Sequence, residues 1–168
     1  MLRQKSSSSS MAERIVVNTG PLIALARIEA LDIVGRLPFE FICPQEVRDE
    51  IDQGAEVGHP PIEPAWLGVE SLRQRPSPLA LSALDLGEAA VIQLALEQGI
   101  ERVCIDEWKG RRAALAAGLQ VTGVLGLLGR AKMLGFLPAL RPLVERAVER
   151  GIRYHPKLVD KVLSAVGE

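Results

Sequence analysis

The 168 residues of this chain suffice for one domain, and a hydrophobic content of 48% supplies a sizeable core, which excludes intrinsic disorder as a class. The formal net charge is −1, so the chain has no global basic field, and any contact with a nucleic acid must come from a local patch. The two cysteines, Cys43 and Cys104, have no CxxC spacing, which fits a reducing compartment and argues against a disulfide scaffold.

The first residues differ in character from the rest. Residues 1–12 contain a run of five serines and have no apolar segment, so they do not match a secretory signal and are expected to form a flexible leader. No apolar run reaches the ~18 residues that a membrane span needs. We therefore expect a single folded domain over residues 13–168 in a soluble, cytoplasmic protein.

The first half of the domain predicts strands alternating with helices. A short β-branched strand ends abruptly at Asn18, and Pro21 fits the first turn of a helix because its missing N–H would be unpaired there anyway. Such alternation is typical of a parallel sheet in an α/β protein. The predicted strands cover 15–17 and 39–42, and the predicted helices cover 22–28, 30–36 and 44–53.

The second half continues the alternation. The clearest helix follows Asp85 and ends at Gly99, a residue suited to terminating helices. Gly123, Gly126 and Gly129 match neither a dinucleotide fingerprint nor a phosphate-binding loop, and they favour close approach by another helix, internal or from a second subunit. Strands are predicted at 67–72, 102–105 and 119–122, and helices at 108–117, 140–150 and 156–166, the last two covering the sheet.

Acidic and basic side chains meet at the end of one predicted strand. Asp106 and Glu107 follow the apolar run 103–105, and ligands of open α/β sheets bind at the carboxyl ends of strands. Asp106 can equally be read as the N-cap of the following helix. The basic residues Lys109, Arg111 and Arg112 can equally form a solvated helix face, and we expect the neighbouring Trp108 to be a partly buried packing residue.

Two further helices carry acids. Asp85 and Glu88 match a capping box, which explains both residues unless a third acid lies near them. On the helix that follows Pro44, the acids Glu46, Asp49 and Asp52 fit a solvated face partly neutralised by Arg48, whereas Glu50 belongs to a motif described next.

Four short motifs in this order resemble the PIN-domain family, in the bacterial and archaeal branch with a Gly-Glu-Ala helix start and asparagine at the first acidic position. The resemblance extends from Arg14 to Glu168. The motifs are Asn-Thr-Gly-Pro-Leu at 18–22, Pro-x-x-Val-x-x-Glu at 44–50, Gly-Glu-Ala at 87–89 and Cys-Ile-Asp-Glu at 104–107.

The resemblance implies a three-layer α/β/α sandwich with a central, mainly parallel sheet. It also implies a metal-dependent endoribonuclease, in many members the toxin of a toxin–antitoxin pair, and a homodimer. Carried over by motif, the catalytic and metal-binding positions are Asn18, Glu50, Glu88 and Asp106, with Glu107 as an auxiliary metal ligand and Thr19 as an orienting residue.

Converging carboxylates suit the chemistry that the resemblance implies. Hard cations such as Mg²⁺ or Mn²⁺ prefer oxygen ligands, and a bound ion can activate water and stabilise the leaving oxygen of a phosphodiester. Because carboxylates repel the phosphates of RNA, Lys109, Arg111 and Arg112 offer the nearest counter-charge, and Arg130 and Lys132 are more distant candidates.

The sequence departs from the usual motif at Asn18. An amide oxygen can still coordinate a hard metal, but it brings no charge, so the affinity for the metal falls. Two hypotheses therefore stay open: a metal-dependent ribonuclease, and a catalytically weak or inactive PIN-like module that binds a partner protein or RNA. A phosphatase-like hydrolase would need a nucleophilic aspartate after the first strand, and Asn18-Thr19-Gly20 supplies none.

Overall fold

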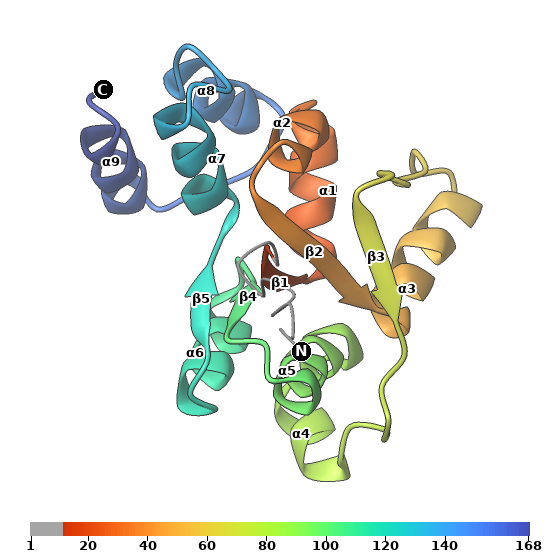
Figure 1. Ribbon diagram of the computed structural model, residues 1–168. Helices are drawn as coiled ribbons and strands as arrows, with labels where there is room; N and C mark the ends of the chain where they lie inside the picture. Colours follow the sequence, from red (N-terminus) through yellow and green to blue (C-terminus); the bar gives the residue numbers. More distant parts are fainter. Residues whose placement is uncertain (1–11) are drawn as a thin grey trace, which may run out of the picture.

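The computed structural model describes residues 12–168 and contains a five-stranded, all-parallel sheet (Figure 1). The predicted leader, apart from Ala12, lies outside the described residues. The strand order is β3-β2-β1-β4-β5, which places the first strand in the centre. The strands are β1 (Glu13–Val17), β2 (Phe39–Pro44), β3 (Leu67–Glu70), β4 (Arg102–Cys104) and β5 (Gln120–Thr122).

Helices cover both faces of the sheet, which confirms the three-layer α/β/α sandwich. Helix α5 packs on β1, β2 and β4, and α3, α4 and α6 lie beside it or at the sheet edges; α1, α2 and α7 pack together on the other side. The helices are α1 (Thr19–Arg27), α2 (Leu31–Gly35), α3 (Gln45–Glu56), α4 (Pro78–Ala83), α5 (Leu86–Gln98), α6 (Trp108–Ala116), α7 (Val124–Met133), α8 (Arg141–Glu149) and α9 (Pro156–Ala165).

Some predicted boundaries were wrong. Pro44 ends β2 and precedes α3 instead of opening it, and α3 continues three residues beyond the predicted end at Gln53. Helix α9 packs mainly on α7 rather than covering the sheet directly. A Cβ added at Gly129 would lie 3.3 Å from Cγ1 of Val162 in α9, so the predicted close helix approach is confirmed, with an internal partner.

The central strand explains how the site is assembled. Ile15, Val16 and Val17 are at most 1% exposed because both faces of β1 are covered by helices. Val17 pairs with Cys104 in a parallel register, and the N–H of Asn18 donates to the carbonyl of Cys104 at 3.0 Å. The residues that follow β1 and β4 are thereby brought side by side at the carboxyl edge of the sheet.

The described residues include no helix long and apolar enough to cross a bilayer.

Candidate metal centre

A small cavity of about 90 Å³ lies at the carboxyl ends of β1 and β4. All six residues predicted to be catalytic, metal-binding or orienting line it, together with Gly20, Pro21 and Asp85. Five of the lining side chains are carboxylic acids, and none is a lysine or arginine. We call this cavity the acid pocket; it is lined by Asn18, Thr19, Gly20, Pro21, Glu50, Asp85, Glu88, Asp106 and Glu107.

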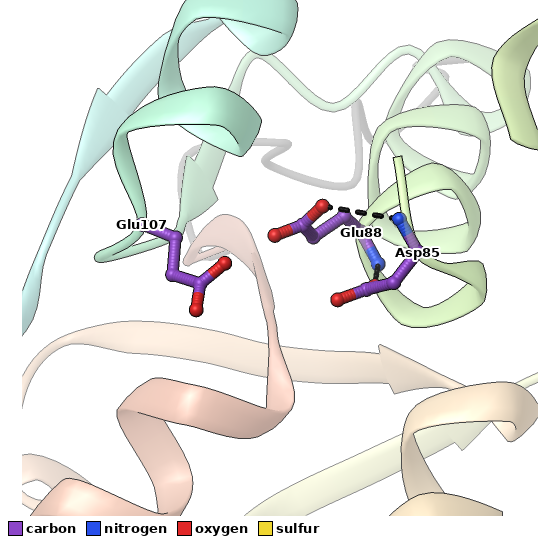
Figure 2. Close-up of side chains that lie close together, drawn as sticks. All are labelled: Asp85, Glu88 and Glu107. Atoms are coloured by element: carbon purple, nitrogen blue, oxygen red, sulfur yellow. Dashed lines mark hydrogen bonds between the residues drawn. The ribbon is translucent and has the colours of Figure 1, made fainter. Parts of the chain in front are cut away.

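Three of the five acids form a tight group (Figure 2). One oxygen from each of Asp85, Glu88 and Glu107 lies within 4.8 Å of the others, and the Glu107 side chain reaches toward Glu88 and Asp85 from the start of α6. The predicted capping box is also present, because Glu88 N–H donates to Asp85 Oδ1 at 2.8 Å and Asp85 N–H donates to Glu88 Oε2 at 3.3 Å. Glu107 is the third acid that capping alone does not explain.

Asp85 is the pocket residue that sequence reasoning missed. Its position before the helix gives it a capping role, and the same residue type at the same spacing serves a cap or a ligand equally well. The only sequence signal for a second role was its place just before the Gly-Glu-Ala motif, from which Leu86 alone separates it.

Glu88 is the buried member of this group of three acids. Its side chain is buried, with 4% of the residue exposed. Burial raises the pKa of Glu88 to about 7, and hydrogen bonding to Glu107 and the negative charge of Asp85 contribute to the rise. A carboxyl group in this position therefore holds a proton near neutral pH unless a positive charge enters the pocket.

Glu50 enters the acid pocket from α3 and is fixed by two neighbours. The hydroxyl of Thr19 donates a hydrogen bond to Glu50 Oε2, so Thr19 orients this carboxylate. Gly87 leaves the space that the carboxylate occupies, because a Cβ at that position would lie 2.9 Å from Glu50 Oε1. The Gly-Glu-Ala motif thus supplies both an acid and room for another one.

Asp106 does not cap α6, so that interpretation was wrong. The N-cap of α6 is Glu107, whose side chain makes no capping hydrogen bond. Asp106 Oδ1 instead accepts from the N–H of Val124, the first residue of α7, at 3.1 Å. A Cβ at Gly123 would overlap this oxygen. Burial raises the pKa of Asp106, while the Val124 N–H and the charge of Arg111 oppose that rise.

The predicted basic trio divides into separate environments, and none of the three lines the acid pocket. Arg111 is half-buried and donates from Nη1 to the carbonyl of Ile105 at 2.7 Å. Arg112 lies over the Trp108 ring, 5.1 Å from its centroid, and Lys109 is exposed. Trp108 is 61% exposed, so its prediction as a partly buried packing residue was wrong.

The other acids of α3 lie outside the pocket. Asp49 accepts from Gln45, and Asp52 forms a salt bridge with Arg48 at 2.7 Å, as expected of a solvated helix face. Glu46 is half-buried in the first turn of the same helix.

Comparison with known families adds an independent observation. A family model described as a PIN domain matches residues 14–168, which is nearly the whole chain. No curated protein matches the sequence. Since the match spans every described strand and helix apart from the first residue of β1, the chain belongs to the PIN-domain family.

Proposed function

We propose that this protein is a metal-dependent endoribonuclease that hydrolyses RNA phosphodiesters with Mg²⁺ or Mn²⁺. PIN domains have a nuclease-like fold, generally use divalent metal ions and typically act on RNA. The observation that carries the proposal is the acid pocket, in which five carboxyl groups and no basic side chain converge at the strand ends.

The residues of the pocket fit a hard divalent cation. Asp85, Glu88 and Glu107 offer three oxygens within 4.8 Å of one another, and oxygen is the ligand that Mg²⁺ and Mn²⁺ prefer. We assign the ion to these three residues, with Glu50, Asp106 and Asn18 completing the oxygen-rich wall. The raised pKa of Glu88 is the expected property of a ligand whose counter-charge is a metal, since ligands release protons when a metal binds.

The protein's own groups would prepare the pocket for the reaction. Thr19 fixes Glu50, and the Val124 N–H fixes one oxygen of Asp106, so these carboxylates need no reorientation when substrate arrives. When bound, a divalent cation supplies an activated water and charge stabilisation for the leaving oxygen. A side-chain nucleophile is not required.

The test is cleavage of single-stranded and structured RNA by the purified protein, with Mn²⁺ or with EDTA. We expect cleavage with Mn²⁺, none with EDTA, and none by Asp106→Asn or Glu107→Gln, because each removes a charge from the pocket. Asp32→Asn is the matched control, an exposed acid of α2 away from the pocket. Cleavage that survives both pocket substitutions would overturn the assignment.

A second candidate function is a catalytically weak or inactive PIN-like module that binds a partner protein or RNA. Asn18 favours it, because a neutral amide stands where the family has an acid. Asn18→Asp separates the two candidates. An active enzyme should bind Mn²⁺ more tightly and cleave faster with the aspartate, whereas RNA binding without cleavage by either form, with Mn²⁺ present, would establish the binding module.

The resemblance to toxin relatives supports a biological role as the toxin of a toxin–antitoxin pair, acting in the cytoplasm as a homodimer with a protein antitoxin. Induced expression in bacteria should arrest growth, and expression of Asp106→Asn should not. Light scattering of the purified protein measures the dimer directly.

A further inference from the structure

An exposed tryptophan stands next to the acid pocket. Trp108 is the first residue of α6 and directly follows Glu107, whose carboxylate belongs to the group of three acids that we assign to the ion (Figure 2). The residue is 61% exposed, so its ring contributes little to the core. The roles assigned so far to the pocket and its neighbours leave this side chain without a purpose.

One face of the Trp108 ring is covered by an arginine. The guanidinium carbon of Arg112, one turn further along α6, lies 5.1 Å from the ring centroid, which is a cation–π contact. Residues four apart are neighbours on a helix surface, so the local sequence alone forms this pair. Because Trp108 remains 61% exposed with Arg112 in place, the opposite face of the ring is open to solvent. We call this opposite face the outer face of Trp108.

The surroundings of the ring are basic. Lys109 and Arg112 are both exposed, and within residues 12–168 neither takes part in a salt bridge. Their positive charge is therefore available to a phosphate backbone that passes over the start of α6. An aromatic face flanked by basic side chains is the arrangement with which proteins hold single-stranded nucleic acids.

The place of the ring limits what can reach it. The Cα atoms of Glu107 and Trp108 are about 3.8 Å apart, as in any trans peptide. A phosphate bound to an ion at Glu107 therefore brings an adjoining base close to the outer face of Trp108.

We propose that the outer face of Trp108 is a stacking subsite for one unpaired base of the RNA, next to the phosphate that the acid pocket binds. This inference rests on the proposed function, because it takes RNA as the substrate of the pocket. Every base has a π-face, so the subsite would accept any base. A base inside a duplex is stacked on both sides, so the subsite would favour single-stranded over double-stranded RNA.

A second exposed apolar residue separates this proposal from a contact with a protein. Leu115 is 60% exposed and lies on the same side of α6, about 10 Å further along the helix axis. A protein packed on this side of α6 would contact both residues. A base held at the pocket end of the helix would contact Trp108 and leave Leu115 free.

The test measures binding in the Asp106→Asn background with Mn²⁺, where the proposed function predicts no cleavage. Three fluorescent probes of about ten nucleotides are titrated by anisotropy: a single-stranded RNA, the same RNA in a duplex, and a single strand of equal charge that lacks bases. We expect Trp108→Ala to weaken binding of the single-stranded RNA about tenfold and to leave the other two affinities unchanged. Trp108→Tyr should restore most of the loss, and Leu115→Ala is the matched control.

Two further measurements separate stacking from a structural role. Saturation with the single-stranded RNA should quench the fluorescence of Trp108, whereas Trp66 packs on Phe41, 5.1 Å between ring centroids, and should not respond. The quenching should therefore disappear in Trp108→Tyr. In the otherwise unchanged protein, Trp108→Ala should raise the KM for cleavage of single-stranded RNA about tenfold, with little change in kcat.

The outcomes distinguish this inference from the proposed function. RNA cleavage with no quenching, and with an affinity that Trp108→Ala does not change, would overturn the subsite and leave the ribonuclease intact. Quenching and selective loss of affinity without any cleavage would support the subsite and overturn the ribonuclease. Equal weakening of all three probes would also overturn the subsite. So would conversion of a dimer to a monomer by Trp108→Ala and Leu115→Ala alike, measured by light scattering, with RNA binding unchanged.

Discussion

The acid pocket and a larger cavity walled by α1, α7 and α9, which we call the C-terminal groove, are neighbouring cavities that share Gly20 and Asp106 and have opposite charge. The acid pocket measures about 90 Å³ and gathers five carboxyl groups without a basic residue. The groove measures about 940 Å³ and gathers five basic residues around aliphatic walls. The first has the size and chemistry of an ion site, whereas the second is too large for an ion and has the opposite charge.

Asp106 is the acid common to both cavities. Its Oδ1 accepts from the first N–H of α7, and helix N-termini favour negative charge, so the fold keeps a carboxylate on the boundary. Each cavity also contains groups that lower the stability of the fold. The acid pocket holds carboxyl groups that repel one another, and the groove exposes aliphatic side chains to water. Features that lower stability and persist in a well-packed fold are expected at functional sites. Four experiments test the roles assigned to the acid pocket and to its boundary with the groove.

The largest effect is expected from Glu88→Gln. Removing this charge should reduce Mn²⁺-dependent cleavage by more than about 100-fold, the upper range for losing a group that supports a metal site. Single-turnover cleavage measures the loss, with Glu101→Gln as an exposed control. Unchanged cleavage by Glu88→Gln would remove Glu88 from the metal site.

The acid pocket should also make stability depend on pH. The pKa of Glu88 rises from 4.5 to about 7 in the folded protein, so between these values the folded state binds more protons than the unfolded state. Stability in EDTA should therefore fall as pH rises through this window, by roughly 3 kcal/mol. Urea unfolding from pH 4.5 to 8 measures it. Glu88→Gln should flatten the profile, and a steady rise of wild-type stability over this range would contradict the assigned pKa.

Gly123→Ala tests the boundary between the cavities. The added Cβ would overlap Asp106 Oδ1 and lie 3.1 Å from Arg111 Nη1, so the hydrogen bond to Val124 must lengthen or break. We expect a loss of about 1–3 kcal/mol in the free energy of unfolding. Gly20→Ala is the control, since no atom lies within 4 Å of a Cβ placed there. Equal stability of the two variants would mean that α7 moves away without cost.

The smallest effect on stability is expected from Gly87→Ala. The atoms that the new Cβ meets are the end of the flexible Glu50 side chain, and alanine favours the helix, so stability should change by less than about 0.5 kcal/mol. Displacement of Glu50 should nevertheless raise the dissociation constant for Mn²⁺ a few-fold, as measured by calorimetry. Unchanged affinity for Mn²⁺ would remove Glu50 from the metal site.

The position of the acid pocket followed from sequence because parallel strands end at one edge. Asn18 and Asp106 each come directly after a predicted strand, and the motif order added Glu50 and Glu88. Asp85 was missed because capping accounted for it fully. Most residues of the pocket could therefore be predicted from the sequence. Which of its acids lie close enough together to share one ion could not.

The C-terminal groove could not be predicted in the same way. Its basic residues extend from Arg27 to Lys161, and no local pattern connects them. They come together only because α9 packs on α7, and the sequence favoured a close helix approach without naming the partner. The exposure of Trp108 has the same origin, since a helix pattern does not say which side a neighbouring element covers.

Helix α1 links the site to a remote part of the chain. Its N-terminal end carries Thr19, and at its C-terminal end Arg146 donates to the carbonyl of Ile28 at 2.8 Å while Arg150 donates to that of Arg27. Arg146 belongs to α8, and Arg150 is the C-cap residue of the same helix. Substitution of Arg146 would therefore remove a hydrogen bond from the C-terminal end of α1, the helix whose first residue, Thr19, holds Glu50, without changing a residue that lines the acid pocket.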